Sequence, residues 1–316
     1  MTQAAIQKPQ LTPAPNASHA PPVTQAPPTA HVPPVRPERE YALPSVAAQD
    51  VQRQLPWLTQ LRQSDGFRRT LVVIGFLLLW ELAARIHNND LLLPSVWQTA
   101  LALWDGIVTG ELLVKTRISL AILLQAYVGG ALLAFVLTAL AVSTRAGRDV
   151  LATLTAMLNP LPAIALLPIA LLWFGLGQGS LIFVLIHSVV WPMALNTFAG
   201  FQAVPETLRM TGRNYGLKGL PFVLQILVPA ALPAILTGLK IGWAFAWRTL
   251  IAAELVFGAS SGKGGLGWYI FQNRNELLTD RVFAGLVMVI AIGLLVEGLI
   301  FRTVERFTVR RWGMLR

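Results

Sequence analysis

The stretch from Gly216 to Pro229, GLKGLPFVLQILVP, lies between two long apolar runs at about 180–201 and 230–256. A helix that crosses a membrane needs about 20 mainly apolar residues, so both runs are predicted to be spans. The residues that join them are polar and basic, and we expect them to form a loop outside the bilayer. The fold is therefore predicted to be that of a helical membrane protein.

The composition supports this class. The chain of 316 residues is 54% hydrophobic and 13% charged, with a mean hydropathy of +0.58, whereas soluble domains are about a quarter charged. The absence of cysteine excludes disulfides and thiolate metal sites, and the four histidines lack ligand spacing. The net charge of +10 comes from loops beside apolar runs, so we expect no nucleic acid partner.

Apolar runs of spanning length recur along the chain. The predicted fold class is an all-α polytopic membrane protein in the lipid bilayer, with an interfacial periplasmic helix at 91–108, where the run is short and interrupted by Trp97, Trp104 and Asp105. Its six predicted transmembrane helices lie at about 70–86, 118–142, 150–174, 180–201, 230–256 and 282–304.

Charge predicts the orientation of these spans. With six spans, one side of the membrane carries 13 Lys and Arg residues near span ends and the other carries 5. The positive-inside rule places both termini and the 202–228 loop in the cytoplasm. Residues 1–60 contain 12 of the 21 prolines and no apolar periodicity, so they are predicted to be a disordered cytoplasmic tail, and 61–316 a transmembrane domain.

The loop contains signals for a short helix. Pro205 is predicted at the first helical position, where no amide donor is needed, and Glu206 follows it in the first turn, where the helix dipole favours an acid. Gly216 suits the left-handed residue that ends a helix. We therefore predict an amphipathic cytoplasmic helix over about 203–219.

Several further motifs accompany the loop. They are PLPAIA at 160–165, WFGLG at 173–177, PAALPAILTGLK at 229–240, AAE at 252–254 and GGLG at 264–267. Together with the spacing from Gly216 to Pro229, they resemble the permease subunits of ABC importers that serve aliphatic sulfonates, taurine, nitrate, bicarbonate and pyrimidine precursors. Val228 stands where these permeases have leucine.

The resemblance implies a type I importer fold and a set of partners. They are a second permease copy, most simply giving a homodimer, two cytoplasmic ABC ATPases and a periplasmic or lipoprotein solute-binding protein, in a bacterial inner membrane. The chain itself has no nucleotide motif, because the Gly-Lys-Gly at 262–264 lacks the Walker glycine and the following Ser or Thr. ATP and magnesium are thus expected only on the ATPase, and this chain is expected to be no enzyme and to bind no cofactor.

In this family the loop acts as a coupling helix in an ATPase groove. Met210-Thr211-Gly212 stands where the family's Glu-Ala-Ala is expected, so the usual acid is missing. We interpret Met210 as an apolar residue that fills the groove. The predicted ATPase-coupling residues are Glu206, Arg209, Met210, Gly212, Arg213, Gly216 and Pro229.

Polar residues inside the spans are candidates for the substrate pathway. Arg248 either faces the dimer axis and attracts an oxyanion, or pairs with an acid or carbonyl of a neighbouring helix. For Glu254 we expect a structural or gating role, because an anionic side chain would repel an anionic solute. The full set of pathway candidates is Arg248, Trp247, Glu254, His187, Asn196 and Asn159.

Other features have simpler interpretations. Prolines 160, 162 and 168 are expected to bend the third span, and Gly238-x-x-x-Gly242 to permit close helix packing. The glycine-rich stretch 258–281 is either near the mouth that receives the binding protein or an interfacial loop anchored by its aromatic residues.

Two alternatives to an importer of a small anion remain open. One is an ABC importer of a pyrimidine precursor or aromatic acid. The other is a secondary transporter coupled to protons or sodium, which would need acids in the middle of the membrane, whereas Glu254 and Glu297 are near span ends. No paired acids or Ser/His constellation favours a membrane enzyme.

Overall fold

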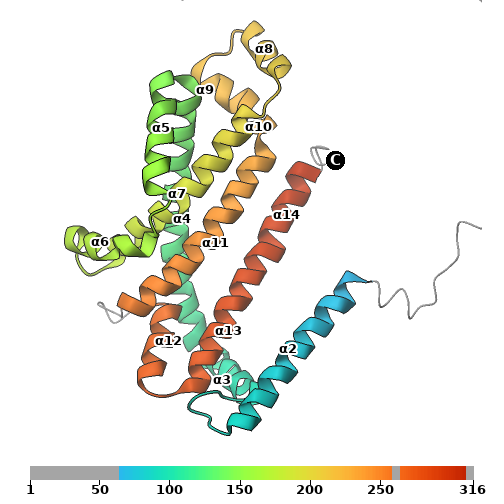
Figure 1. Ribbon diagram of the computed structural model, residues 1–316, viewed down its shortest axis with the longest axis vertical. Helices are drawn as coiled ribbons and strands as arrows, with labels where there is room; N and C mark the ends of the chain where they lie inside the picture. The colour runs from blue at the N-terminus through green and yellow to red at the C-terminus, as the bar shows by residue number, and fades with distance from the viewer. Residues whose placement is uncertain (1–63, 258–263, 311–316) are drawn as a thin grey trace, which may run out of the picture. The chain divides into compact units, whose positions relative to one another are not determined.

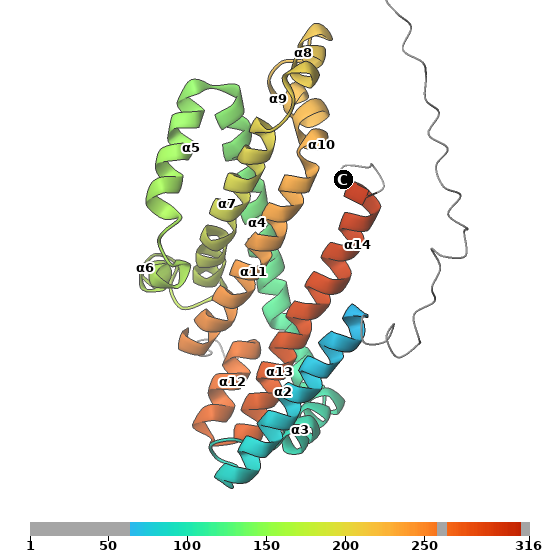
Figure 2. The same cartoon turned by 45° about the vertical axis from the view of Figure 1, so that its right-hand side comes forward.

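The structure is a computed structural model that describes residues 64–257 and 264–310. The predicted tail, 1–60, and most of the Walker-like segment lie outside the described residues. Within the described ranges every regular element is a helix, as Figures 1 and 2 show. The predicted all-α class is thereby confirmed.

Four described helices are long and apolar enough to cross a membrane: α2 (Asp65–His87), α4 (Glu111–Ser143), α7 (Gln178–Gln202) and the continuous helix from α13 (Thr279–Leu295) to Thr308. The last runs through a π-helical segment, Val296–Phe301, and α14 (Arg302–Glu305). Many apolar side chains on these helices are exposed, such as Val72 at 73% and Leu79 at 68%, which suits contact with lipid.

Two bent helix pairs bring the possible number of spans to six. In the first, α5 (Arg145–Leu158) meets Ala163–Leu166 and α6 (Leu167–Phe174) at 89°. The bend expected from the prolines is thus an interruption of the helix. Pro160 and Pro162 remove backbone donors and restrict the residues before them, so the helical ladder stops at Asn159.

The second bend lies next to Pro229. The helical turns of α9 (Gly219–Phe222), η2 (Val223–Leu227) and α10 (Val228–Ala230) meet α11 (Leu232–Phe257) at 82°. Pro229 and Pro233 on either side of the bend lack the backbone N–H that a continuous helix would use.

The shorter helices lie at the span ends. α3 (Val96–Val108) occupies most of the predicted interfacial segment and begins with a capping box between Ser95 and Gln98. It is tied to neighbouring helices through Trp80, which donates to the Pro94 carbonyl at 3.0 Å and packs on Phe283 with ring centroids 5.5 Å apart. α12 (Leu266–Asn275) was not predicted as a helix.

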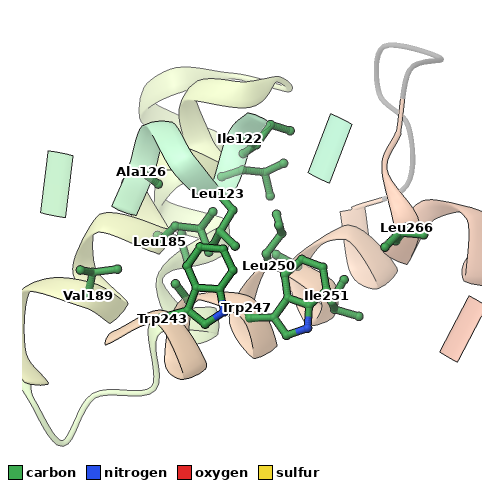
Figure 3. Packing of buried hydrophobic residues seen from close by; sticks show 14 of the residues in the cluster. Ile122, Leu123, Ala126, Leu185, Val189, Trp243, Trp247, Leu250, Ile251 and Leu266 are labelled. Carbon is green, nitrogen blue, oxygen red and sulfur yellow. The ribbon is translucent and has the colours of Figure 1, made fainter. Parts of the chain in front are cut away.

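The hydrophobic core lies where α4, α7, α11 and α12 meet (Figure 3). Trp243 of α11 points toward Leu123 of α4 and Leu185 of α7 there, and Trp247 lies beside Leu250 and Ile251. Small residues allow this close packing: a Cβ at Gly238 would lie 3.2 Å from the Met193 Cα of α7. Gly238-x-x-x-Gly242 therefore packs against α7, as predicted.

Candidate functional site

α8 (Glu206–Asn214) is the helix of the predicted coupling loop, and it is shorter than the expected 203–219. Pro205 precedes the first helical residue, so its expected place inside the helix is wrong by one position. Gly216 adopts φ +77° and ends the helix as predicted. Its N–H donates to the Arg213 carbonyl, and the Leu217 N–H to that of Gly212, which is a Schellman motif.

Arg209 holds α8 to the end of α7. Its Nε donates to the Val204 carbonyl at 3.2 Å and its Nη2 to the Phe201 carbonyl at 2.5 Å. The side chain is only 19% exposed. Carbonyls at a helix C-terminus favour a cation, so Arg209 joins two helices instead of reaching outward.

The opposite sides of α8 have different surroundings. Gly212 is buried, and a Cβ there would lie 2.8 Å from Ile226 and 3.0 Å from Phe222, so α8 rests on the α9–η2 segment through this glycine. Met210 is 49% exposed, and the Arg213 and Glu206 side chains, 3.6 Å apart, are 63% and 62% exposed. Of the other expected coupling residues, Gly216 forms the turn, and Pro229 lies in α10 at the bend.

Glu254 is buried and caps α12 from another helix. Its carboxylate accepts the Gly267 N–H at 2.8 Å and the Ser119 hydroxyl at 2.9 Å, while Ser119 Oγ accepts the Leu266 N–H at 2.8 Å. Leu266 and Gly267 are the first residues of α12, whose free amides favour an anion. One carboxylate thus connects α4, α11 and α12.

The glycines of the GGLG motif make this capping possible. A Cβ at Gly265 would collide with the Ser119 hydroxyl and the Glu254 carboxylate, and one at Gly267 would lie 2.6 Å from the Ile251 carbonyl oxygen. Neighbouring Tyr269 is buried in the core, and burial raises the pKa of its hydroxyl to about 12. Gly265 and Gly267 belong to the GGLG motif noted in the sequence, but their role with Ser119 was missed.

Arg248 lies on an exposed face of α11 beside an open cavity of about 470 Å³. Its Nε donates to the Ala244 carbonyl of its own helix at 2.9 Å, and its guanidinium lies 5.0 Å from the Phe245 ring centroid. Among the described residues it has no ion pair and no bond to a neighbouring helix. Trp247 lines the same cavity and donates to the Val289 carbonyl at 3.3 Å.

His187 and Asn159 line a second cavity, of about 270 Å³, on the side of α11 that carries Phe245 and Thr249. His187 packs edge-on against Trp191, with ring centroids 5.9 Å apart. Asn196 lies apart from both cavities and donates to the Pro192 carbonyl of its own helix at 2.7 Å. The structure therefore divides the predicted pathway residues into two cavities, a capping site and one helix-packing position.

The described part of the chain contains no cluster of three His, Cys, Asp or Glu side chains that could hold a metal ion. The charged groups of the site are carboxylates and guanidinium groups that bind backbone atoms or line cavities. Such contacts hold neighbouring helices in place.

Comparison with known proteins identifies the family. Residues 126–309 match the model described as "Binding-protein-dependent transport system inner membrane component". A putative ABC transporter permease of Methanocaldococcus jannaschii is 33% identical over 69% of this chain and 82% of its own length. A putative aliphatic sulfonates transport permease of Escherichia coli is 30% identical over 71% and 84%. A bicarbonate transport permease of Synechococcus elongatus is 28% identical over 74% and 86%.

The matched region begins within α4 and ends one residue before the described chain does, so it includes the coupling loop, Glu254 and both cavities, while Ser119 precedes it. Several helices of this region have the length and apolar character of membrane spans. The chain is a multi-pass membrane protein and belongs to the family of inner membrane permease components of binding-protein-dependent transport systems.

Proposed function

We propose that this chain is the permease of an ATP-driven importer that carries a small solute bearing an oxyanion group. Two copies would enclose the pathway and alternate access, each with an ATPase on its α8 and a solute-binding protein on the opposite face. The observation that carries the proposal is the construction of α8. Arg209 binds α8 to the end of α7, and Gly212 packs it against the α9–η2 segment. Met210 and Arg213 remain exposed and can contact a partner.

The orientation follows from charge. Basic residues concentrate at the ends of the helices that lie on the side of α8, and the positive-inside rule makes that side cytoplasmic. The ATPase would therefore meet α8 inside the cell, and α3 and α12 would face the periplasm. The missing acid at Met210 changes which contacts the ATPase makes, while the docking helix itself is retained.

The solute class rests on relatives and on Arg248. The names of relatives specify aliphatic sulfonates, nitrate, taurine and bicarbonate as cargo, and all of these carry an oxyanion. A guanidinium offers forked donors that match such groups. Arg248 has no ion pair among the described residues, which leaves its charge for a solute.

The proposal is tested by replacing residues 206–214 with a Gly/Ser linker of equal length in the full chain. Expressed with the ATPase encoded for the same system, the unaltered chain should retain that ATPase on purification and support ATP-dependent uptake. The linker variant should insert in the membrane but lose both properties. Glu276→Gln, at the other end of the molecule, serves as a control that retains the ATPase on purification.

Two results would refute the proposal. The first is retention of the ATPase by the linker variant, because α8 would then not be the docking element. The second is uphill transport by the purified chain in liposomes without any ATPase, which would indicate a secondary transporter.

A further inference from the structure

The cavity beside Arg248 contains an unusual set of charges for a groove between membrane helices. It lies between α11 and the α13 helix with its π-helical continuation, and Lys240, Arg248 and Glu297 line it together with Trp243 and Trp247. Charged side chains inside spans are costly, and they usually pair with one another or mark a functional site.

Of the three charged residues that line the cavity, only Lys240 forms an ion pair with a described residue. Lys240 Nζ lies 2.6 Å from a carboxylate oxygen of Glu305, and both side chains are about one third exposed. Arg248 and Glu297 line the same cavity, but neither forms an ion pair with any described residue. Lys240 and Glu305 therefore neutralise each other directly. Arg248, on α11, and Glu297, on the π-helical continuation of α13, have no such partner among the described residues and line the same cavity.

Arg248 is also held in a defined position. Its Nε is bonded to the Ala244 carbonyl one turn earlier, and Ala244 lines the cavity as well. The contact with the Phe245 ring stabilises the guanidinium without using its terminal nitrogens. No described residue accepts a hydrogen bond from these terminal nitrogens, so they remain available to a ligand.

Two tryptophan side chains line the same space. Trp243 and Trp247 of α11 are only 8% and 6% exposed, so they form part of the cavity wall. The apolar indole faces of Trp243 and Trp247 would contact a short carbon chain between two charged ends.

We infer that this cavity binds a small zwitterion, with its oxyanion group on Arg248 and its ammonium group on Glu297. The ligand class is a short amino-sulfonate or amino-carboxylate. A zwitterion neutralises both charges at once, whereas a simple anion would leave the Glu297 carboxylate alone in an apolar groove. The inference rests on the proposed function, whose oxyanion specificity it narrows to solutes that also carry an amine.

Ligand binding to the permease itself tests the inference. The full chain in lipid nanodiscs is examined by saturation-transfer NMR with taurine and with ethanesulfonate, which has the same sulfonate but no amine. We expect taurine to bind more tightly by about tenfold to a hundredfold, the range for one charge-assisted hydrogen bond. Glu276→Gln, an exposed acid outside the cavity, should bind both ligands as the unaltered chain does.

Two substitutions assign the two ends of the ligand. In Glu297→Gln, taurine binding should fall to the level of ethanesulfonate while ethanesulfonate binding stays unchanged; Glu297→Asp should retain part of the preference. In Arg248→Gln, both ligands should weaken. Each variant is checked for intact size-exclusion behaviour and melting temperature, so that a folding defect is recognised as such.

Equal binding of taurine and ethanesulfonate by the unaltered chain would overturn the inference, as would no binding of either. A Glu297→Gln variant that weakens both ligands equally would also overturn it, because Glu297 would then act on the fold. None of these results affects retention of the ATPase by α8. The proposed function and this inference can therefore fail independently.

Discussion

Removal of the Ser119 hydroxyl should release the start of α12. This hydroxyl donates to the Glu254 carboxylate at 2.9 Å and accepts the Leu266 N–H at 2.8 Å. A hydrogen bond to a charged group contributes about 1.5–3 kcal/mol and a neutral one about 1 kcal/mol. Ser119→Ala should therefore lower the stability of the α12 attachment by about 2–4 kcal/mol.

Hydrogen–deuterium exchange of the full chain in nanodiscs measures this loss locally. If α12 amides exchange by opening of this attachment, about 2–4 kcal/mol corresponds to exchange faster by about thirtyfold to a thousandfold. The effect should be confined to peptides that cover α12 and the adjoining end of α11. Peptides from α8 should keep their protection in the variant.

Ser188→Ala is the matched control. Ser188 is also a buried serine in a long helix, but its hydroxyl donates to the Leu185 carbonyl of the same helix at 2.7 Å. Its loss should cost no more than about 1 kcal/mol and leave α12 unchanged. Equal effects of the two substitutions on α12, or unaltered protection in Ser119→Ala, would refute the capping role of this network.

Four further substitutions test other contacts of the described helices. Gly216→Ala should lower stability by about 1–2 kcal/mol, because φ is +77° there; an unchanged melting temperature would contradict this geometry. Tyr127→Phe should cost about 1 kcal/mol through loss of the 2.8 Å bond to the Leu239 carbonyl, and a stabilised variant would count against that bond. Arg209→Gln should reduce ATP-dependent uptake without loss of membrane insertion, while Arg213→Gln, an exposed neighbour, should change stability by less than about 0.5 kcal/mol. An unchanged melting temperature in Arg209→Gln would contradict the joining of α7 and α8 by this side chain.

Features with a local cause could be predicted from the sequence. Long apolar runs predicted α2 and α7 because the thickness of the bilayer fixes the length of a span. The end of α8 at Gly216 was predictable because a left-handed residue strongly favours glycine. Pro160 and Pro162 likewise predicted a bend after Asn159, although the angle between the two helices depends on packing.

Features that join distant segments could not be predicted. Ser119 and Glu254 are 135 residues apart, and nothing near either residue indicates the other. α12 was missed for the same reason, since its first residues are glycine-rich and resemble a loop. Its amides are capped by a side chain of α11, so the local sequence carries no capping residue.

The rotation of α11 about its own axis could not be predicted from the sequence either. The sequence shows that Arg248 and Glu254 lie on different faces, but it does not say which face meets the core. In the structure Trp247 and Leu250 turn inward, so Arg248 faces the cavity and Glu254 reaches α12. Helix rotation depends on the summed burial of all side chains, and a polar residue contributes little to that sum.

α11 connects the two regions that the proposed function requires. Its first residues follow the bend beside η2, on which α8 rests through Gly212, and its last turns contain Glu254, which caps α12. Between these ends the helix packs mainly against α7 and also contacts α4. A closely packed helix moves as a rigid body more easily than it bends. Displacement of α8 by an ATPase is therefore expected to turn α11 as a unit, moving Arg248 and the cap of α12 together.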